Sequence, residues 1–259
     1  NRVKEELFDD YDHWILTRLL ETNQRITEAF SQFECNQVTH ILYEFFWSDF
    51  CDTYVEVSKS KLAQDDLKHN VLAIQDLVIR QLLLMIEPVA PFITEELWSM
   101  LGYGKKGSFL QENQIESTEQ LESALADRSI TLDTEAANQV DRLEELISKA
   151  RALKAESNLG SNRDVTLYYK AGKKSAALIE GHMVSLIKQI GAENLTPTSE
   201  DMDLPASVSE LATVYIDLTS SVDVEAEKDI YRKNRVRGAY SRRAGSSEYD
   251  GAYRVKPLQ

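Results

Sequence analysis

The chain has 259 residues, of which 42% are hydrophobic and 28% are charged, as in a soluble globular protein of one large or two ordinary domains. Its net charge of −14 opposes indiscriminate binding to nucleic acid. No uninterrupted apolar run approaches the roughly 20 residues that span a bilayer, so we expect no membrane protein. Two cysteines and four scattered histidines are too few for a disulfide framework or a structural zinc site, and they predict a reducing, cytoplasmic location.

The charge is unevenly distributed along the chain. Residues 229–259 contain eight basic and three acidic residues, a net charge of +5, so residues 1–228 carry −19. Any RNA contact in residues 1–228 must therefore be local. The tail has no hydrophobic period and is expected to be disordered, either as a native segment that attracts phosphates without sequence preference or as a reading-frame artefact. The chain begins without a methionine or a signal sequence, which predicts a trimmed chain or an internal piece of a longer one.

The first hundred residues follow a helical period almost throughout. Apolar residues recur at spacings of four and seven across residues 12–30, and at i, i+3, i+4, i+7 and i+8 from Val38 to Phe46. A third run, residues 67–86, is apolar on all sides at its end, which predicts burial. Pro91 suits the first turn of a short helix that continues through residue 98. Long amphipathic segments with short connections predict an antiparallel helical bundle over residues 1–101.

The period changes twice in the rest of the chain. Residues 102–132 are polar and predict a connector with one short helix, whereas residues 133–157 predict a long helix. Apolar residues then alternate at 165–169 and 212–218, with helical spacing between them and room for a short strand near 194–196. We therefore predict a mainly α protein, in which the bundle is followed by the long helix and a small α/β unit (133–228, with a helix beginning at 222) and by the basic tail (229–259).

No motif supplies a self-sufficient active site. Residues 102–107 match GxGxxG, but a helix precedes them and a polar stretch follows, whereas the nucleotide fingerprint needs a strand before it and a helix after it. Lys59 and Lys61 flank a serine as in a nucleotide loop, yet they lie at the end of a predicted helix, where lysines favour the helix dipole. The histidines lack metal-ligand spacing. We expect neither a catalytic residue nor a metal site in this chain.

Three aromatic residues of the predicted bundle lie partly outside its apolar stripes: Trp14, Trp47 and Tyr54. The first interpretation is that they lie at the boundary of the core. The alternative is a platform on which unpaired RNA bases stack, with nearby carboxylate and arginine side chains contacting the base edges. Their spacing does not decide between the two.

Three segments on successive predicted helices carry a more specific signal: DHWILTRL at residues 12–19, YEFFWSDFCDTYVE at 43–56 and PFITEELW at 91–98. In that order they resemble the anticodon-binding domain of class I aminoacyl-tRNA synthetases of the valine, isoleucine and leucine group. The string FFWSDFCD is similar to the valine members in particular. RALKAESN (151–158), the strand at 165–169 and VDVEAEK (222–228) resemble the region that follows the bundle in those members, so the resemblance covers residues 8–228.

The resemblance implies a tRNA-binding part of a longer enzyme. Such enzymes use ATP and Mg on a Rossmann domain with HIGH and KMSKS signatures, and neither signature occurs here. The chain is then expected to be the C-terminal portion of a valine–tRNA ligase, continuous with a catalytic domain, monomeric, and able to bind valine-specific tRNA but not to aminoacylate it. We expect no cofactor in this segment.

Two features depart from the resemblance. Thr53 stands where relatives often have an aromatic residue, which weakens any proposal of base stacking at that position. Relatives continue after VDVEAEK into a coiled-coil arm, whereas the residues from Tyr231 onward have no heptads, so contact with tRNA through such an arm is in doubt.

The resemblance implies that the bundle presents Arg18, Trp47 and Asp49 to splayed anticodon bases. Arg18 is expected to stack or contact phosphate, Trp47 to stack, and Asp49 to accept from a base amino group or to hold Arg18. Arg151 and Lys154 are predicted to contact the RNA backbone. The alternative function is a helical protein-interaction module without RNA binding or catalysis, which the −19 charge of residues 1–228 favours.

Overall fold

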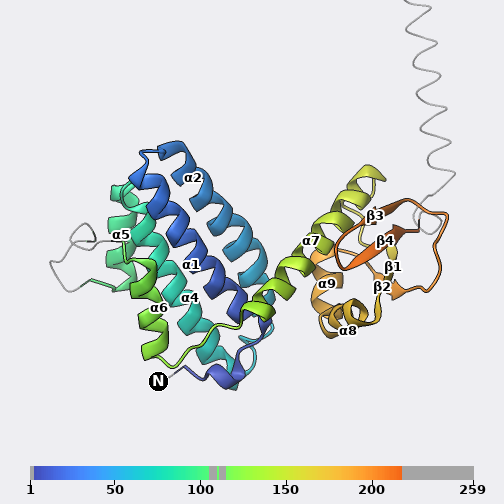
Figure 1. Ribbon diagram of the computed structural model, residues 1–259, viewed down its shortest axis with the longest axis horizontal. Coiled ribbons are helices and arrows are strands. Elements are labelled where there is room, and N and C mark those ends of the chain that lie inside the picture. Colours follow the sequence, from blue (N-terminus) through green and yellow to red (C-terminus); the bar gives the residue numbers. More distant parts are fainter. Residues whose placement is uncertain (1–2, 105–109, 111–114, 218–259) are drawn as a thin grey trace, which may run out of the picture. The chain divides into compact units, whose positions relative to one another are not determined.

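The computed structural model describes residues 3–104, 110 and 115–217 (Figure 1). It confirms the predicted fold class, because helices make up the first part of the chain and a small mixed sheet follows. The described residues divide into two compact units, one drawn from residues 3–147 with 177–185 and one from residues 148–176 with 186–217. The predicted helix from residue 222 and the basic tail lie outside the described residues, and the predicted boundaries at 101 and 132 stay predictions.

The first unit is a helical bundle whose members begin and end at recognisable signals. α1 (Asp10–Ser31) begins at a capping box, in which the side chains of Asp9 and Asp12 each accept from the other residue's backbone N–H. α5 (Pro91–Leu101) has Pro91 in its first turn and ends at Gly102, whose φ of 75° places it in the left-handed region. The first glycine of the GxGxxG pattern therefore ends a helix. The other elements here are η1 (Glu5–Leu7), α2 (Cys35–Tyr43), η2 (Glu44–Val55), α3 (Glu56–Ser58), α4 (Asp65–Ile86) and α6 (Thr118–Asp127).

The second long helix of the bundle changes its winding partway along. α2 continues directly into η2, which is a π-helix, and hydrogen bonds in a π-helix link residue i to i+5. Buried aromatic side chains in η2 accordingly recur at spacings of five and four: Phe45, Phe50 and Tyr54. The prediction that Phe46 belongs to the buried stripe is wrong, because the wider turn leaves this side chain 41% exposed.

The bundle core is formed mainly by α1, α2, η2 and α4. The apolar end of α4 is buried as predicted, from Leu82 through Met85. Among the described residues, α4 is the one helix long and apolar enough to cross a membrane by length and composition. Half of its most apolar stretch is buried inside the protein, which is the pattern of a core helix.

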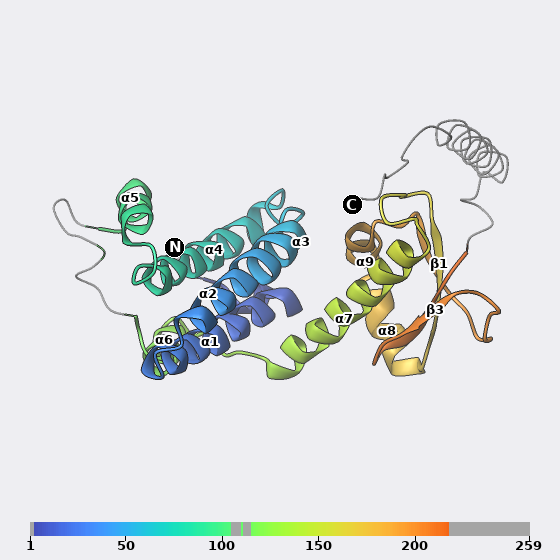
Figure 2. The same cartoon turned by 90° about the horizontal axis from the view of Figure 1, so that it is seen from above.

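The second unit contains a four-stranded sheet in the order β2-β1-β4-β3. β1 (Thr166–Ala171) pairs in parallel with β2 (Asn194–Pro197) and antiparallel with β4 (Ala212–Ile216), which also pairs antiparallel with β3 (Ala206–Val208). Figure 2 shows α9 (Met183–Ile190) and the end of α7 (Thr134–Glu156) on one side of the sheet.

Two details of this unit differ from the sequence-based expectation. β3 was not predicted, because three residues are too short to show a period of two. The helical region expected between the strands is divided into α8 (Lys173–Gly181) and α9 by a break at His182.

Candidate nucleic-acid interface

Arg18 on α1 and Asp49 on η2 are brought together by the fold. Nε of Arg18 donates to Oδ2 of Asp49 over 3.0 Å, and Nη1 of Arg18 donates to Glu21 over 2.9 Å. The Arg18 side chain is 23% exposed and that of Asp49 is 13% exposed. Asp49 thus holds Arg18, which is the second of the two roles considered for it, while the contact of either residue with RNA stays a prediction.

The pair is partly shielded from water, and this shielding shifts both pKa values. Burial raises the pKa of Asp49 above its ordinary value, although the neighbouring guanidinium of Arg18 opposes the rise. Burial alone would lower the pKa of Arg18, but the charge of Asp49 and their hydrogen bond outweigh it, so the pKa of Arg18 is raised. Arg18 therefore stays charged, and its guanidinium is fixed in place.

Three exposed aromatic side chains lie shortly before Asp49 in the sequence, and we call Tyr43, Phe46 and Trp47 the aromatic group. Trp47 is 51% exposed and Tyr43 is 64% exposed. Their rings stack with centroids 6.5 Å apart and planes 10° apart. The sequence reasoning missed Tyr43 and Phe46. Tyr43 could have been found from its position four residues before Trp47, which is one helical turn away and outside the buried stripe.

Trp14 and Tyr54, the other two aromatic candidates, are core residues. Trp14 is 2% exposed, and its indole Nε1 donates to Asp141 over 2.7 Å. Tyr54 is fully buried, and its hydroxyl donates to Oδ1 of Asp12 over 2.8 Å. Thr53 is also buried, so its departure from the family pattern does not affect stacking at the surface. Of the three aromatic candidates, the structure leaves Trp47 available to a base.

Arg151 and Lys154 lie in the second unit and bind the end of α9. Nε of Arg151 donates to the backbone carbonyl of Gln189 over 2.9 Å, and Nζ of Lys154 donates to the carbonyls of Ile190 and Gly191. These interactions satisfy carbonyls that a helix end leaves without intrahelical partners. The prediction that Lys154 contacts the RNA backbone conflicts with its burial, since the residue is 2% exposed and its ammonium is held by carbonyls. Arg151 remains exposed.

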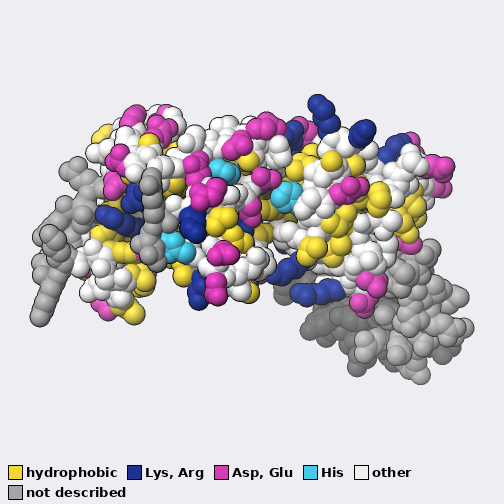
Figure 3. Space-filling model, turned by 90° about the horizontal axis from the view of Figure 1, so that it is seen from below, with side chains coloured by type: hydrophobic (Ala, Val, Ile, Leu, Met, Phe, Trp, Pro, Cys, Tyr) yellow, Lys and Arg dark blue, Asp and Glu magenta, His cyan; other side chains and the backbone are white. Residues whose placement is uncertain are grey.

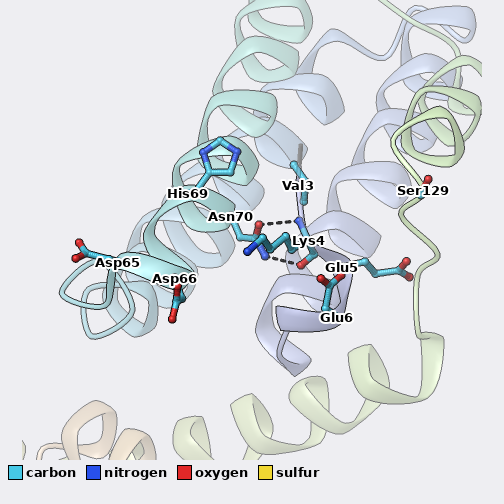
Figure 4. A pocket seen from close by; sticks show the side chains of 9 residues that line it. All are labelled: Val3, Lys4, Glu5, Glu6, Asp65, Asp66, His69, Asn70 and Ser129. Carbon is cyan, nitrogen blue, oxygen red and sulfur yellow. Dashed lines mark hydrogen bonds between the residues drawn. The ribbon is translucent and has the colours of Figure 1, made fainter. Parts of the chain in front are cut away.

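A hollow of about 650 Å³ lies between the N-terminal segment and α4 (Figure 4). The side-chain amide of Asn70 holds this segment through the backbone of Lys4. Its Oδ1 accepts from the Lys4 N–H over 3.0 Å, and its Nδ2 donates to the Lys4 carbonyl over 2.6 Å. Four carboxylates dominate the lining and oppose the approach of a phosphate: Glu5, Glu6, Asp65 and Asp66. We therefore assign the hollow a structural role.

Metal-binding side chains do not converge anywhere in the described part of the chain, which holds no group of three or more His, Cys, Asp or Glu residues placed to bind an ion. Acidic side chains are instead spread over the face shown in Figure 3, with basic ones between them. The aromatic group and the Arg18–Asp49 pair are therefore the best candidates for an interface in the bundle.

Comparison with known proteins agrees with this arrangement. Residues 12–169 match the family described as the anticodon-binding domain of tRNA ligase. Valine–tRNA ligases from Enterococcus faecalis, Thermotoga maritima and Petrotoga mobilis are 28%, 29% and 30% identical over 83%, 84% and 87% of this chain. The match covers 24%, 24% and 25% of those relatives, so the chain spans about a quarter of their length. The chain belongs to the anticodon-binding domain family of class I tRNA ligases and is homologous to the C-terminal region of valine–tRNA ligases.

Proposed function

We propose that this chain binds the anticodon loop of a valine-specific tRNA through the aromatic group and the Arg18–Asp49 pair. The observation that carries the proposal is the exposed Trp47, stacked on Tyr43 and two residues from the carboxylate that holds Arg18. Large aromatic rings that remain half exposed on a helix offer faces on which unpaired bases stack. Membership of the anticodon-binding family supports tRNA as the ligand.

Each residue has a distinct role in this proposal. Trp47 and Tyr43 supply stacking surfaces, which tolerate any base. Arg18 supplies the hydrogen-bond donors of its guanidinium that Asp49 and Glu21 leave free, and these suit a base edge or a phosphate. Asp49 acts as a positioning residue, because one of its oxygens already accepts from Arg18.

The proposal extends to the longer enzyme. The chain serves as the C-terminal part of a cytoplasmic valine–tRNA ligase in protein biosynthesis, and it acts as a monomer. ATP and Mg belong to a catalytic domain with HIGH and KMSKS signatures, which this sequence lacks, so the chain binds tRNA without charging it. An ATP–pyrophosphate exchange assay with valine is expected to show no activity.

A titration with three RNAs tests the proposal. Filter binding compares a valine tRNA transcript, the same transcript with an altered anticodon, and a non-cognate tRNA, all at one salt concentration because affinity depends on salt. We expect the unaltered valine transcript to bind most tightly. Equal affinity for all three would contradict anticodon recognition.

A protein-interaction role is the second candidate, and the outer side of α5 favours it. Four of its apolar side chains are largely exposed, between 49% and 91%: Phe92, Ile93, Met100 and Leu101. Exposed apolar patches of this kind mark contacts with other proteins. Absence of tRNA binding at low salt would favour this candidate.

A further inference from the structure

The bundle surface proposed above does not account for the charge of an RNA ligand. Arg18 and Arg25 are paired there with the carboxylates of Glu21, Glu44 and Asp49, so the surface is nearly neutral. RNA carries one negative charge per nucleotide, and binding in salt depends on basic groups that replace its counterions. A chain of net charge −14 that binds tRNA therefore needs a basic surface elsewhere.

Apart from the basic tail at 229–259, such a concentration of positive charge exists in residues 148–176. This segment holds seven basic and two acidic residues, a net charge of +5. The chain has 29 basic residues in all, so almost a quarter of them lie in this short stretch. The segment belongs to the second unit and includes the end of α7 and all of β1.

The basic side chains of this segment are mostly not neutralised. Lys170 forms an ion pair with Asp201 at 2.8 Å, and Lys154 is buried against backbone carbonyls. The other five are exposed and form no ion pair with any residue that the structure describes: Lys149, Arg151, Arg163, Lys173 and Lys174. In the first unit, by contrast, five of the nine basic side chains that the structure describes are paired with carboxylates: Arg18, Arg25, Lys59, Lys61 and Arg142.

Arg151 and Lys154 bind neighbouring carbonyls at the end of α9, those of Gln189 and Ile190. Arg163 follows the turn in which the backbone N–H of Leu159 donates to the carbonyl of Lys154 over 2.8 Å. Burial lowers the pKa of Lys154, and repulsion from Arg163 and Arg151 lowers it further, so the three positive charges interact. Arg163 is carried on an ordered connection after α7. Asn158 ends the helix with a φ of 57°, and the side chain of Asn162 then accepts from the backbone N–H of Asp164 over 2.8 Å.

Stability of the fold explains only part of this charge. Lys149 and Arg151 lie near the C-terminal end of α7, where a positive charge is favourable, and Arg151 also binds the end of α9. Arg163 lies outside any helix, and Lys173 and Lys174 open α8, where the helix dipole disfavours a positive charge. These three residues place positive charge where the fold does not use it.

We infer that residues 148–176 form a phosphate-binding surface, centred on Arg151 and Arg163, that holds the RNA backbone while the bundle contacts the bases. The inference rests on the proposed function, because it takes tRNA as the ligand. It assigns affinity and salt dependence to the second unit, and discrimination between tRNAs to the bundle. Phosphate contacts position a protein on nucleic acid without reading its sequence, so the two roles are separable by experiment.

The experiment measures tRNA affinity against salt concentration for the full chain and its variants. Arg163→Gln and the double variant Arg151→Gln/Arg163→Gln remove one and two charges from the surface. The matched control, Lys68→Gln/Arg128→Gln, removes two exposed charges from the bundle, and Arg128 also donates to a backbone carbonyl, that of Ala124. The Arg163 side chain forms no hydrogen bond or ion pair with the residues that the structure describes. Arg163→Gln is therefore the variant expected to leave folding intact.

The slope of log affinity against log salt is negative, and we expect it to become less steep by about 0.7–0.9 for each phosphate that the variant no longer binds. The double variant is expected to bind valine tRNA several-fold more weakly at low salt, with the ratio of cognate to non-cognate affinity unchanged. The control is expected to keep the wild-type slope. An unchanged slope in the Arg151/Arg163 variant, or an equal change in both double variants, would overturn the inference.

Two further measurements separate this inference from its alternatives. If the wild-type chain prefers valine tRNA and the Arg163 variants bind it with the same affinity and salt dependence, the inference fails while the proposed function stands. If the wild-type chain binds no tRNA, both fail. A titration with poly-L-glutamate tests an acidic protein as the ligand, and binding as tight as that of tRNA would overturn the assignment to RNA.

Discussion

Arg18 and Asp49 are 31 residues apart in the chain, yet Nε of Arg18 lies 3.0 Å from Oδ2 of Asp49. The bond joins α1 to the π-helical segment η2, and it fixes the direction of a guanidinium that is 23% exposed. Because the carboxylate is less exposed than the guanidinium, Asp49 supports Arg18 from below the surface. The pair therefore offers one oriented cationic group, held by the same segment, η2, that carries the exposed Phe46 and Trp47.

Replacement of Arg18 tests whether this group contacts RNA. Arg18→Ala is expected to weaken binding of valine tRNA by about 1–3 kcal/mol if Arg18 reads a base. Asp49→Asn keeps an oxygen that can accept from Nε of Arg18, so this variant is expected to lose less tRNA affinity than Asp49→Ala. Fluorescence anisotropy with labelled tRNA measures all three, with Arg128→Ala as the control for removal of an exposed arginine outside the proposed surface. An unchanged affinity for Arg18→Ala would remove Arg18 from the site.

Replacement of Trp47 tests its contribution to tRNA binding separately from its contribution to the stability of the fold. Trp47→Ala is expected to lose about 1–3 kcal/mol of tRNA binding, the contribution of stacking with one base, whereas Trp47→Phe is expected to keep much of it. Because the side chain is 51% exposed but its ring stacks on Tyr43, the free energy of unfolding is expected to fall by about 0.5–1.5 kcal/mol, the contribution of an aromatic pair, and the variant is expected to stay folded.

Phe92→Ala is the matched control for Trp47, since Phe92 is a 91% exposed aromatic residue on α5. It is expected to leave tRNA affinity unchanged. If the Phe92 and Trp47 variants bound tRNA equally well, the aromatic group would have no special role in recognition.

The fold was largely predictable because its helices bury long apolar stripes. Residues 12–30 and 67–86 show the period of α1 and α4, and Pro91 identifies the start of α5. The π-helix was not predictable, because α-helical spacing describes the sequence as far as Phe46 almost as well. Choosing between the two windings requires the tertiary contacts that bury Phe50 and Tyr54.

The candidate site was less predictable than the fold, and for a physical reason. The sequence identifies Arg18, Trp47 and Asp49 as polar or amphipathic residues, but not which side of the helix faces solvent. Lys154 shows the consequence most clearly. Its position late in a helix suits a solvent-exposed cation, whereas the actual partners are carbonyls 36 and 37 residues further along the chain. Contacts so distant in sequence leave no local pattern.

Tyr54 is expected to contribute strongly to stability. Its hydroxyl donates to Asp12 over 2.8 Å in the core, and Lys61 lies 3.0 Å from the same carboxylate. Burial, and then the charge of Asp12, raise the pKa of Tyr54 far above its ordinary value. Tyr54→Phe is expected to lower the free energy of unfolding by about 1.5–3 kcal/mol, as for hydrogen bonds to charged groups.

Tyr103→Phe is the control for this substitution. The Tyr103 hydroxyl donates to Asp76 over a similar 2.8 Å, but at an exposed position. Its loss is expected to cost less than about 1 kcal/mol, because water replaces the partner. Urea unfolding measures both variants, and equal losses would contradict a special role for the buried bond.

Lys154 leads to a prediction about pH. Burial, with repulsion from Arg163 and Arg151, lowers its pKa below the ordinary 10.5. Between that lowered pKa and 10.5 the unfolded chain binds more protons at this residue than the folded chain does, so the stability contributed by Lys154 rises with pH in this window. The neutral amine still donates to the carbonyls of Ile190 and Gly191, so no hydrogen bond needs to be lost.

Lys154→Met measures this contribution. The variant leaves two carbonyls without their donor and is expected to lower the free energy of unfolding by about 1–3 kcal/mol at neutral pH. In urea unfolding from about pH 8 to 11, the difference between wild type and variant is expected to widen as the pH rises toward 10.5. Lys170→Met is the control, and its pH dependence is expected to run the other way. The hydrogen bond to Asp201 raises the pKa of Lys170, so the stability that Lys170 contributes is lost as the pH rises through this raised pKa. A Lys154 difference that shrinks with pH would mean that its ammonium is favoured, rather than disfavoured, where it is buried.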